Sequence, residues 1–230
     1  MKKNILFTIL IIICVLICGC KNNDVTIEER NIIGGWDIDV SNENNNIPSK
    51  IKKVFESATK DYTKMKLTPI TLLGTQIVSG TNYMYLCKAE TDTSFKWVIV
   101  TIYNDLEGNS ELKNVKYFNL NDYVNINSNN NTVQTLGGWT VNENSTIKLE
   151  DNIQKIFDEV TNIDENIIYK PIALLGEQIS TGTNYAVLAT CYNKQDNTLS
   201  IKLLTIYNDL ESNSKLISSA NVPLAKYTKQ

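Results

Sequence analysis

The feature that most constrains the fold of this chain is an internal repeat. Four short blocks occur twice in the same order, at offsets of 102 to 104 residues: 34–36 and 137–139, 69–74 and 171–176, 76–83 and 178–185, and 101–107 and 205–211. Such agreement indicates a tandem duplication, and the period fits two domains better than a solenoid repeat. A polar, Asn-rich stretch separates the copies. We therefore expect one domain at 32–124, a linker at 125–134 and a second domain at 135–230.

Each copy contains one helical segment followed by strand-like segments. Apolar residues recur at helical spacing in both copies: Ile51, Val54, Phe55, Ala58 and Tyr62, then Ile153, Ile156, Phe157 and Val160. Asp151 or Ser145 is the expected cap of the second helix, and Pro69 and Pro171 are expected to end the helix-to-strand connections. Strands are expected at 70–78, 82–89, 95–103 and 112–118 in the first copy. This order predicts an α+β fold in which each domain packs one helix across an antiparallel sheet.

The N-terminus is typical of an export signal. Lys2 and Lys3 precede an apolar run at 5–17, which is short for a membrane span, and Cys20 follows Gly19 before a polar stretch. This ending resembles a bacterial lipobox. We therefore predict a lipoprotein that loses residues 1–19 as a signal peptide and carries palmitate-type acyl chains on Cys20. Residues 20–31 would tether it to the outer face of the cell membrane. A transmembrane anchor and an ordinary secretory signal are the alternatives.

The absence of histidine limits the chemistry available to this chain. It excludes Ser-His-Asp and Cys-His catalytic arrangements and any metal site with an imidazole ligand. The net charge of −3 and the lack of a basic stripe argue against a nucleic-acid partner. No Gly-rich phosphate loop stands between a strand and a helix. We expect no enzymatic activity, no cofactor, no metal and no small-molecule substrate.

Two remaining sets of residues, the cysteines and the paired carboxylates, have simple interpretations. Cys87 and Cys191 are non-equivalent in the two copies, and we interpret both as small apolar strand residues. A disulfide between them is an open alternative. The carboxylate pairs recur at equivalent positions, Asp105 with Glu107 and Asp209 with Glu211, and are interpreted as solvated hairpin turns.

The duplicated hairpin carries a resemblance to a known family. Residues 76–80 match the Gln-x-Val-x-Gly hairpin of the cystatins, and 81–83 resemble its extension in the stefin branch. Residues 32–35 resemble the family's N-terminal trunk, two apolar residues before a glycine. The chain is thus similar to two tandem cystatin-like domains, which implies one helix across a four- to five-stranded antiparallel sheet in each.

The resemblance implies inhibition of papain-like cysteine proteases by a wedge that enters the protease cleft. Its protease-binding residues in the first copy would be Ile32, Ile33, Gly34, Gln76, Ile77, Val78, Ser79, Gly80 and Leu106. A weaker set in the second copy would be Gly137, Gln178, Ile179, Ser180, Thr181, Gly182 and Leu210.

Three departures from the family pattern keep a second hypothesis open. Glu107 and Glu211 stand where the family's second hairpin has a proline, and Ser180 stands where valine is expected. We therefore expect the first copy to be the better inhibitor. The alternative is a non-inhibitory protein-binding or scaffold lipoprotein that reuses the same fold, since a fold alone does not determine a function.

Overall fold

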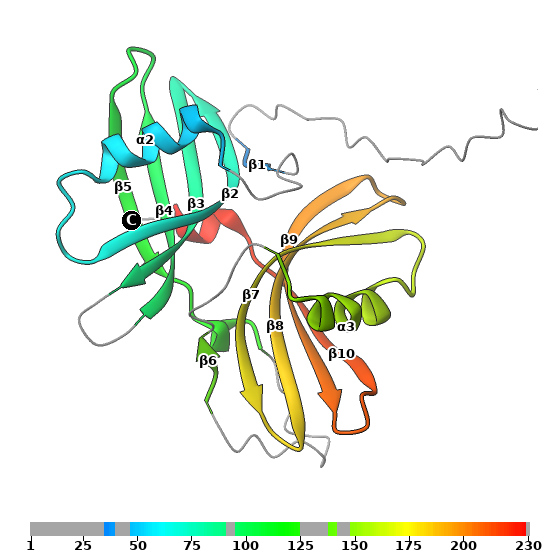
Figure 1. The fold of residues 1–230 in the computed structure, drawn as a ribbon. Coiled ribbons are helices and arrows are strands. Elements are labelled where there is room, and N and C mark those ends of the chain that lie inside the picture. The colour runs from blue at the N-terminus through cyan, green and yellow to red at the C-terminus, as the bar shows by residue number, and fades with distance from the viewer. Residues whose placement is uncertain (1–34, 40–46, 91–94, 125–137, 142–147, 229–230) are drawn as a thin grey trace, which may run out of the picture.

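The computed structural model describes residues 35–39, 47–90, 95–124, 138–141 and 148–228. The predicted signal peptide, the acylation site Cys20, the tether at 20–31 and the linker at 125–134 lie outside these residues. Within them, each copy of the repeat forms one five-stranded antiparallel sheet (Figure 1).

The first copy has the sheet order β1-β2-β3-β4-β5. Its elements are β1 (Asp37–Ile38), α2 (Ser49–Thr59), β2 (Lys66–Val78), β3 (Gly80–Glu90), β4 (Phe95–Asn104), β5 (Ser110–Tyr117) and the 3₁₀ helix η1 (Leu120–Asp122). The strands predicted for this copy are all present, each within a few residues of its expected bounds.

The second copy repeats this order as β10-β9-β8-β7-β6. Its elements are β6 (Thr140–Val141), α3 (Asp151–Thr161), β7 (Ile167–Ile179), β8 (Gly182–Asn193), β9 (Thr198–Asp209), β10 (Ser214–Asn221) and the 3₁₀ helix η2 (Leu224–Tyr227).

The two prolines lie inside strands and do not end a connection, contrary to the prediction. Pro69 pairs with Cys87 within β2, and Pro171 pairs with Ala189 within β7. A register shift follows each proline, and β1 pairs with β2 only farther along, at Gly74 and Thr75. At each proline the strand is paired on one side only among the described residues, and a proline is tolerated in such an edge position.

Each helix covers one face of its own sheet. α2 lies against β4 and β5, and its Phe55 ring meets the edge of Tyr85 at a centroid distance of 5.1 Å. The Tyr85 hydroxyl donates to the carbonyl oxygen of Ile51 over 3.1 Å. Tyr62 lies beyond the helix.

Neither expected residue caps α3. The helix starts after Glu150, which makes no side-chain capping bond, so Asp151 is its first residue. Ser145 lies outside the described residues.

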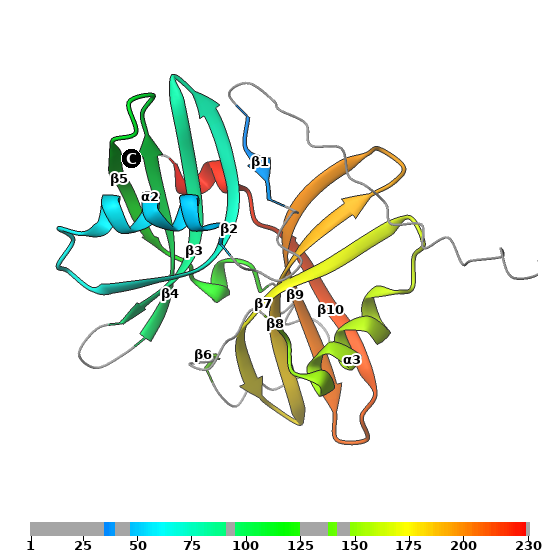
Figure 2. The ribbon, with the colours of Figure 1, turned by 45° about the horizontal axis from the view of Figure 1, so that its top comes forward.

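The predicted fold class is wrong. Among the described residues there are ten strands and only two α-helices of eleven residues each, so the chain is mostly β and not a pair of helix-on-sheet cystatin-like domains. The central strands explain the error, because Met84–Cys87 in β3 and Trp97–Ile102 in β4 are continuously buried. Unbroken burial is typical of a strand covered on both faces. A helix covers one face, and the sheet of the other copy covers the second (Figures 1 and 2).

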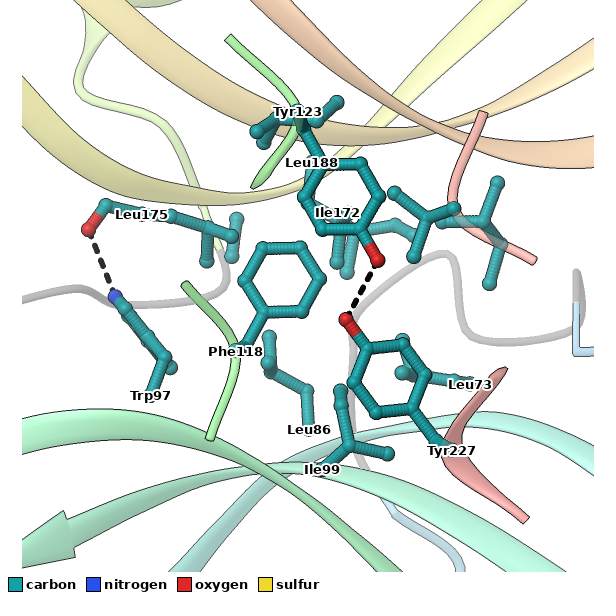
Figure 3. Packing of buried hydrophobic residues seen from close by; sticks show 14 of the residues in the cluster. Leu73, Leu86, Trp97, Ile99, Phe118, Tyr123, Ile172, Leu175, Leu188 and Tyr227 are labelled. Carbon is teal, nitrogen blue, oxygen red and sulfur yellow. Dashed lines mark hydrogen bonds between the residues drawn. The ribbon is translucent and has the colours of Figure 1, made fainter. Parts of the chain in front are cut away.

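The largest hydrophobic cluster lies between the two sheets and draws on both (Figure 3). Leu73, Leu86 and Ile99 of the first sheet belong to it, with Ile172, Leu175 and Leu188 of the second. The Trp97 indole N–H crosses the interface and donates to the carbonyl oxygen of Leu175 over 2.7 Å.

Each 3₁₀ helix packs against the sheet of the other copy, so the two helices are exchanged between the sheets. Leu120 of the first copy packs over Gly176 of the second, and Leu224 of the second packs over Gly74 of the first. In both places an added Cβ would lie 3.0 Å from a leucine Cδ1. Each small residue thus accommodates a side chain of the other copy. This reciprocity is the mark of a two-fold related interface, here within one chain.

Two tyrosine hydroxyls meet where the exchanged segments come together. Tyr123 and Tyr227 are hydrogen-bonded at 2.7 Å, and both are buried. Lys226 donates to the Asp122 carboxylate over 3.1 Å. Partial burial lowers the pKa of Lys226, but its bonds to Asp122 and Tyr123 outweigh burial and leave that pKa raised.

Because one core serves both sheets, the two copies should unfold together. Leu86→Ala removes a fully buried side chain from the inter-sheet cluster. It should lower the free energy of unfolding by about 2–5 kcal/mol. Urea unfolding should keep a single transition, and amide-exchange protection should fall in β8 as well as in β3. Leu106→Ala, at an exposed position, is the matched control and should change little. Separate transitions for the two copies would contradict a shared core.

Candidate protein-binding site

Two hairpin tips lie side by side at one end of the first sheet. One joins β2 to β3, the other joins β4 to β5, and Thr81 of the first pairs with Asn104 of the second. We call residues 76–82 and 103–110 the first hairpin edge. The structure brings the predicted residues of both hairpins together here.

The β2–β3 tip is a tight turn with a fixed backbone. Val78 pairs directly with Gly80, which leaves Ser79 alone at the turn. Gly80 has φ +138°, and an added Cβ would lie 2.5 Å from the carbonyl oxygen of Asn104. Glycine is therefore required both by the backbone conformation and by the close approach of β4.

A tyrosine from the neighbouring strand holds this turn. The Tyr103 hydroxyl donates to the carbonyl oxygen of Ser79 over 2.6 Å. Across the hairpin, the Asn82 amide donates to Gln76 Oε1 over 2.8 Å. Gln76 is thus a structural member of the hairpin as well as a candidate contact residue.

The β4–β5 tip is closed by an aspartate and an asparagine. The Asp105 carboxylate accepts from the backbone N–H of Asn109 at 2.7 Å and from its side-chain amide at 2.8 Å. The side-chain bond from Asn109 is the largest of the hydrogen bonds that lower the pKa of Asp105. This agrees with the interpretation of Asp105 and Glu107 as a polar turn.

Aliphatic side chains project from both tips. Leu106 is 81% exposed and Val78 is 43% exposed, and Ile77 is also exposed. Isolated surface hydrophobics are ordinary, but several on adjoining rigid turns form a ridge that suits an apolar cleft in another protein. Glu107, next to Leu106, is exposed as well and adds a negative charge to the ridge.

The second copy builds an equivalent edge, residues 178–184 and 207–214, called here the second hairpin edge. Asn184 donates to Gln178 over 3.2 Å, and the Asn213 amide donates to Asp209 over 2.9 Å. Thr181 Oγ1 shares a hydrogen bond of 3.1 Å with the Tyr207 hydroxyl.

The aliphatic side chains at the tips of the second edge are more exposed than Val78 of the first edge. Ile179 is 75% exposed and Leu210 is 88% exposed. Ser180 stands where the first edge has Val78. At Gly182 there is no room for a side chain, because an added Cβ would lie 2.2 Å from the carbonyl oxygen of Asn208. The expectation that the first copy is the better inhibitor stays a prediction.

Some predicted site residues cannot be placed on either edge. Ile32, Ile33, Gly34 and Gly137, the proposed trunk residues, lie outside the described part of the chain.

Sequence reasoning missed the residues that hold the tips. Tyr103 and Tyr207 were visible only as members of a duplicated block, and Asn109 and Asn213 were not singled out. Their recurrence at the same offset was the available signal, because a side chain that fixes a turn must be kept in both copies.

Within the described ranges, no group of three or more His, Cys, Asp or Glu side chains is arranged to hold a metal ion. Cys87 and Cys191 are both free and buried, and burial raises the pKa of the Cys87 thiol well above its usual range. Both therefore act as apolar strand residues, as interpreted. Over the same ranges, no helix is long and apolar enough to cross a membrane.

Comparison with known proteins adds no relative. No protein-family model matches the chain, and no curated protein matches it. The hairpin motif and the geometry of the two edges are therefore the basis for any functional conclusion.

Gly80→Ala should strain the first edge. The backbone there is unfavourable for a side chain, and the added Cβ meets Asn104 and Tyr103. The free energy of unfolding should fall by about 1–3 kcal/mol, and the Ser79 amide should shift in the NMR spectrum. Gly138→Ala is the control, because nothing lies within 4 Å of its added Cβ. An equal effect of the two substitutions would contradict a strained turn at Gly80.

Asn109→Ala should raise the pKa of Asp105 toward its ordinary value, because the main hydrogen bond to the carboxylate is lost. A lowered folded-state pKa means that ionised Asp105 stabilises the turn above its ordinary pKa. That stabilisation disappears as pH falls through the lowered value. NMR titration of the Asp105 side-chain carboxyl measures its pKa in the unaltered chain and in the variant. Asp209 is the internal control, since Asn213 still holds its pKa down. An unchanged Asp105 titration would exclude Asn109 as the cause.

Proposed function

We propose that this chain binds another protein by inserting the first hairpin edge into an apolar cleft, and that the partner is a papain-like cysteine protease, which it inhibits. The observation that carries the proposal is the placement of Val78 and Leu106 on adjoining, rigidly held tips, with both side chains exposed. The protease class follows from the Gln-x-Val-x-Gly hairpin at residues 76–80.

The rigidity of the edge favours tight binding. The turns are already held by Tyr103, by the Gln76–Asn82 pair and by Asp105 with Asn109. Little conformational entropy is then lost on association, and a preformed surface needs little rearrangement. Full burial of an exposed valine contributes about 1.5–3 kcal/mol, and Val78, which is 43% exposed in the free protein, gains the corresponding part of it.

The shape of the turn would let such an inhibitor fill the cleft without offering a scissile bond in register, because the tip is a tight turn and not an extended segment. The carbonyl oxygen of Ser79 already accepts a hydrogen bond from the Tyr103 hydroxyl within the protein. This bond and the backbone conformation of Gly80 hold the turn, so the Ser79–Gly80 bond would lie in the cleft without being presented as an extended substrate.

The site of action belongs to the same proposal. Acylation of Cys20 would hold the protein at the outer face of the cell membrane, with the polar residues 20–31 between the lipid and the first sheet. The protease would then be met outside the cell.

The proposal is tested by titrating papain with residues 21–230. Inhibition is expected at or below micromolar concentration, and its absence there would reject the proposal. To isolate the first edge, Val78→Asp with Leu106→Asp is introduced into a chain that already carries Ile179→Asp and Leu210→Asp. The inhibition constant should rise at least tenfold, which corresponds to about 1.4 kcal/mol. Ile163→Asp, at an exposed site away from both tips, is the matched control.

A protein-binding lipoprotein without inhibitory activity is the second candidate. The exposed Glu107 beside Leu106 favours it, because a carboxylate carried into an apolar cleft must be desolvated. A partner with a basic rim around its cleft would suit this edge better. Capture of a non-protease partner that is lost in the Val78→Asp, Leu106→Asp variant, together with no inhibition of papain, would support this candidate.

A further inference from the structure

We infer that the second hairpin edge is a docking site in its own right, and that one chain binds two protease molecules at once, one at each end. The inference rests on the proposed function, because it assigns the same class of partner to the second edge. It goes further in stating the number of partners and their arrangement.

The side-chain hydrogen bonds that shape the first edge have counterparts in the second, although the β7–β8 turn has a different pairing from the β2–β3 turn. The cross-hairpin amide pair recurs as Gln178 and Asn184, and the aspartate–asparagine closure recurs as Asp209 and Asn213. The tyrosine is again in contact with the turn, now through Thr181. Ordered turns of this kind are not needed to cover the core, which lies at the middle of the sheets.

The turns of the second edge carry two exposed aliphatic side chains. Ile179 and Leu210 are each at least three-quarters exposed, which is more than Val78 of the first edge. A hairpin tip that serves only to connect strands is usually polar, and an isoleucine or leucine there gains nothing from folding. Two such side chains on adjoining tips therefore point to burial against a partner, as at the first edge.

The two hairpin edges face opposite ends of the molecule. In both ribbon views the tips of the first sheet point to the top of the molecule and those of the second sheet point to the bottom (Figures 1 and 2). The two-fold relation between the sheets produces this arrangement, and the Tyr123–Tyr227 and Trp97–Leu175 bonds hold it. Partners on the two edges would approach from opposite sides and would not collide.

The edges should differ in affinity. Ser180 offers no aliphatic surface where Val78 does, and burial of the exposed part of Val78 corresponds to about three- to tenfold in the dissociation constant. The second site should therefore fill at higher protease concentration than the first.

The experiment is a mass measurement by size-exclusion chromatography with light scattering, using residues 21–230 and excess papain at micromolar concentration. The unaltered chain should carry two papain molecules. Ile179→Asp with Leu210→Asp should carry one, and Val78→Asp with Leu106→Asp should also carry one. The fourfold variant should carry none, and Ile163→Asp should still carry two. All these sites are exposed, so the variants should keep the unaltered unfolding curve.

The possible failures are distinguishable. If the unaltered chain carries one papain and Ile179→Asp with Leu210→Asp changes nothing, the second site is refuted and the proposed function stands. If one papain is bound and only the Ile179→Asp, Leu210→Asp variant loses it, the first edge is refuted, and so is simultaneous binding. If no complex forms with any chain, both proposals are overturned.

Discussion

Burial of two sheet faces against each other is the interaction on which the rest of this structure depends. Each sheet has a second apolar face that its own helix cannot reach, and the sheet of the other copy covers it. The exchange of Leu120 and Leu224 over Gly176 and Gly74 makes the contact reciprocal. Joining the copies in one chain raises the effective concentration of each for the other, so the pair forms within one molecule.

The same interface sets the geometry of the candidate sites. Since the sheets meet through their faces, the ends that carry the hairpin tips stay outside the core. Their turns are stabilised within each edge, by the Tyr103 hydroxyl bonded to Ser79 in the first copy and by Asp209 bonded to Asn213 in the second. Side chains such as Leu106 and Leu210 can then change without disturbing the inter-sheet cluster, which is how loops on a rigid scaffold come to differ in binding.

Much of the secondary structure was predictable, because it depends on local patterns. Helical spacing placed Phe55 and Phe157 on the buried faces of α2 and α3, and strands were expected near the positions where the first copy has them. The fold class was not predicted correctly, because one helix across each sheet accounts for only one of the two buried faces of Met84–Cys87. The hydrogen bond from Tyr103 to Ser79 was also missed, because it joins a turn to a strand that is distant in sequence.

The sequence by itself determined the duplication, the order of helix and strands in each copy, and the two hairpins with their exposed aliphatic residues. These are encoded by short-range periodicity, by turn residues and by direct comparison of one copy with the other. Only the tertiary structure decided that the sheets share a core, that Leu120 and Leu224 are exchanged, and that the two hairpin edges face opposite ends. Such features depend on which apolar surfaces meet, and a linear pattern shows that a face must be buried without showing what buries it.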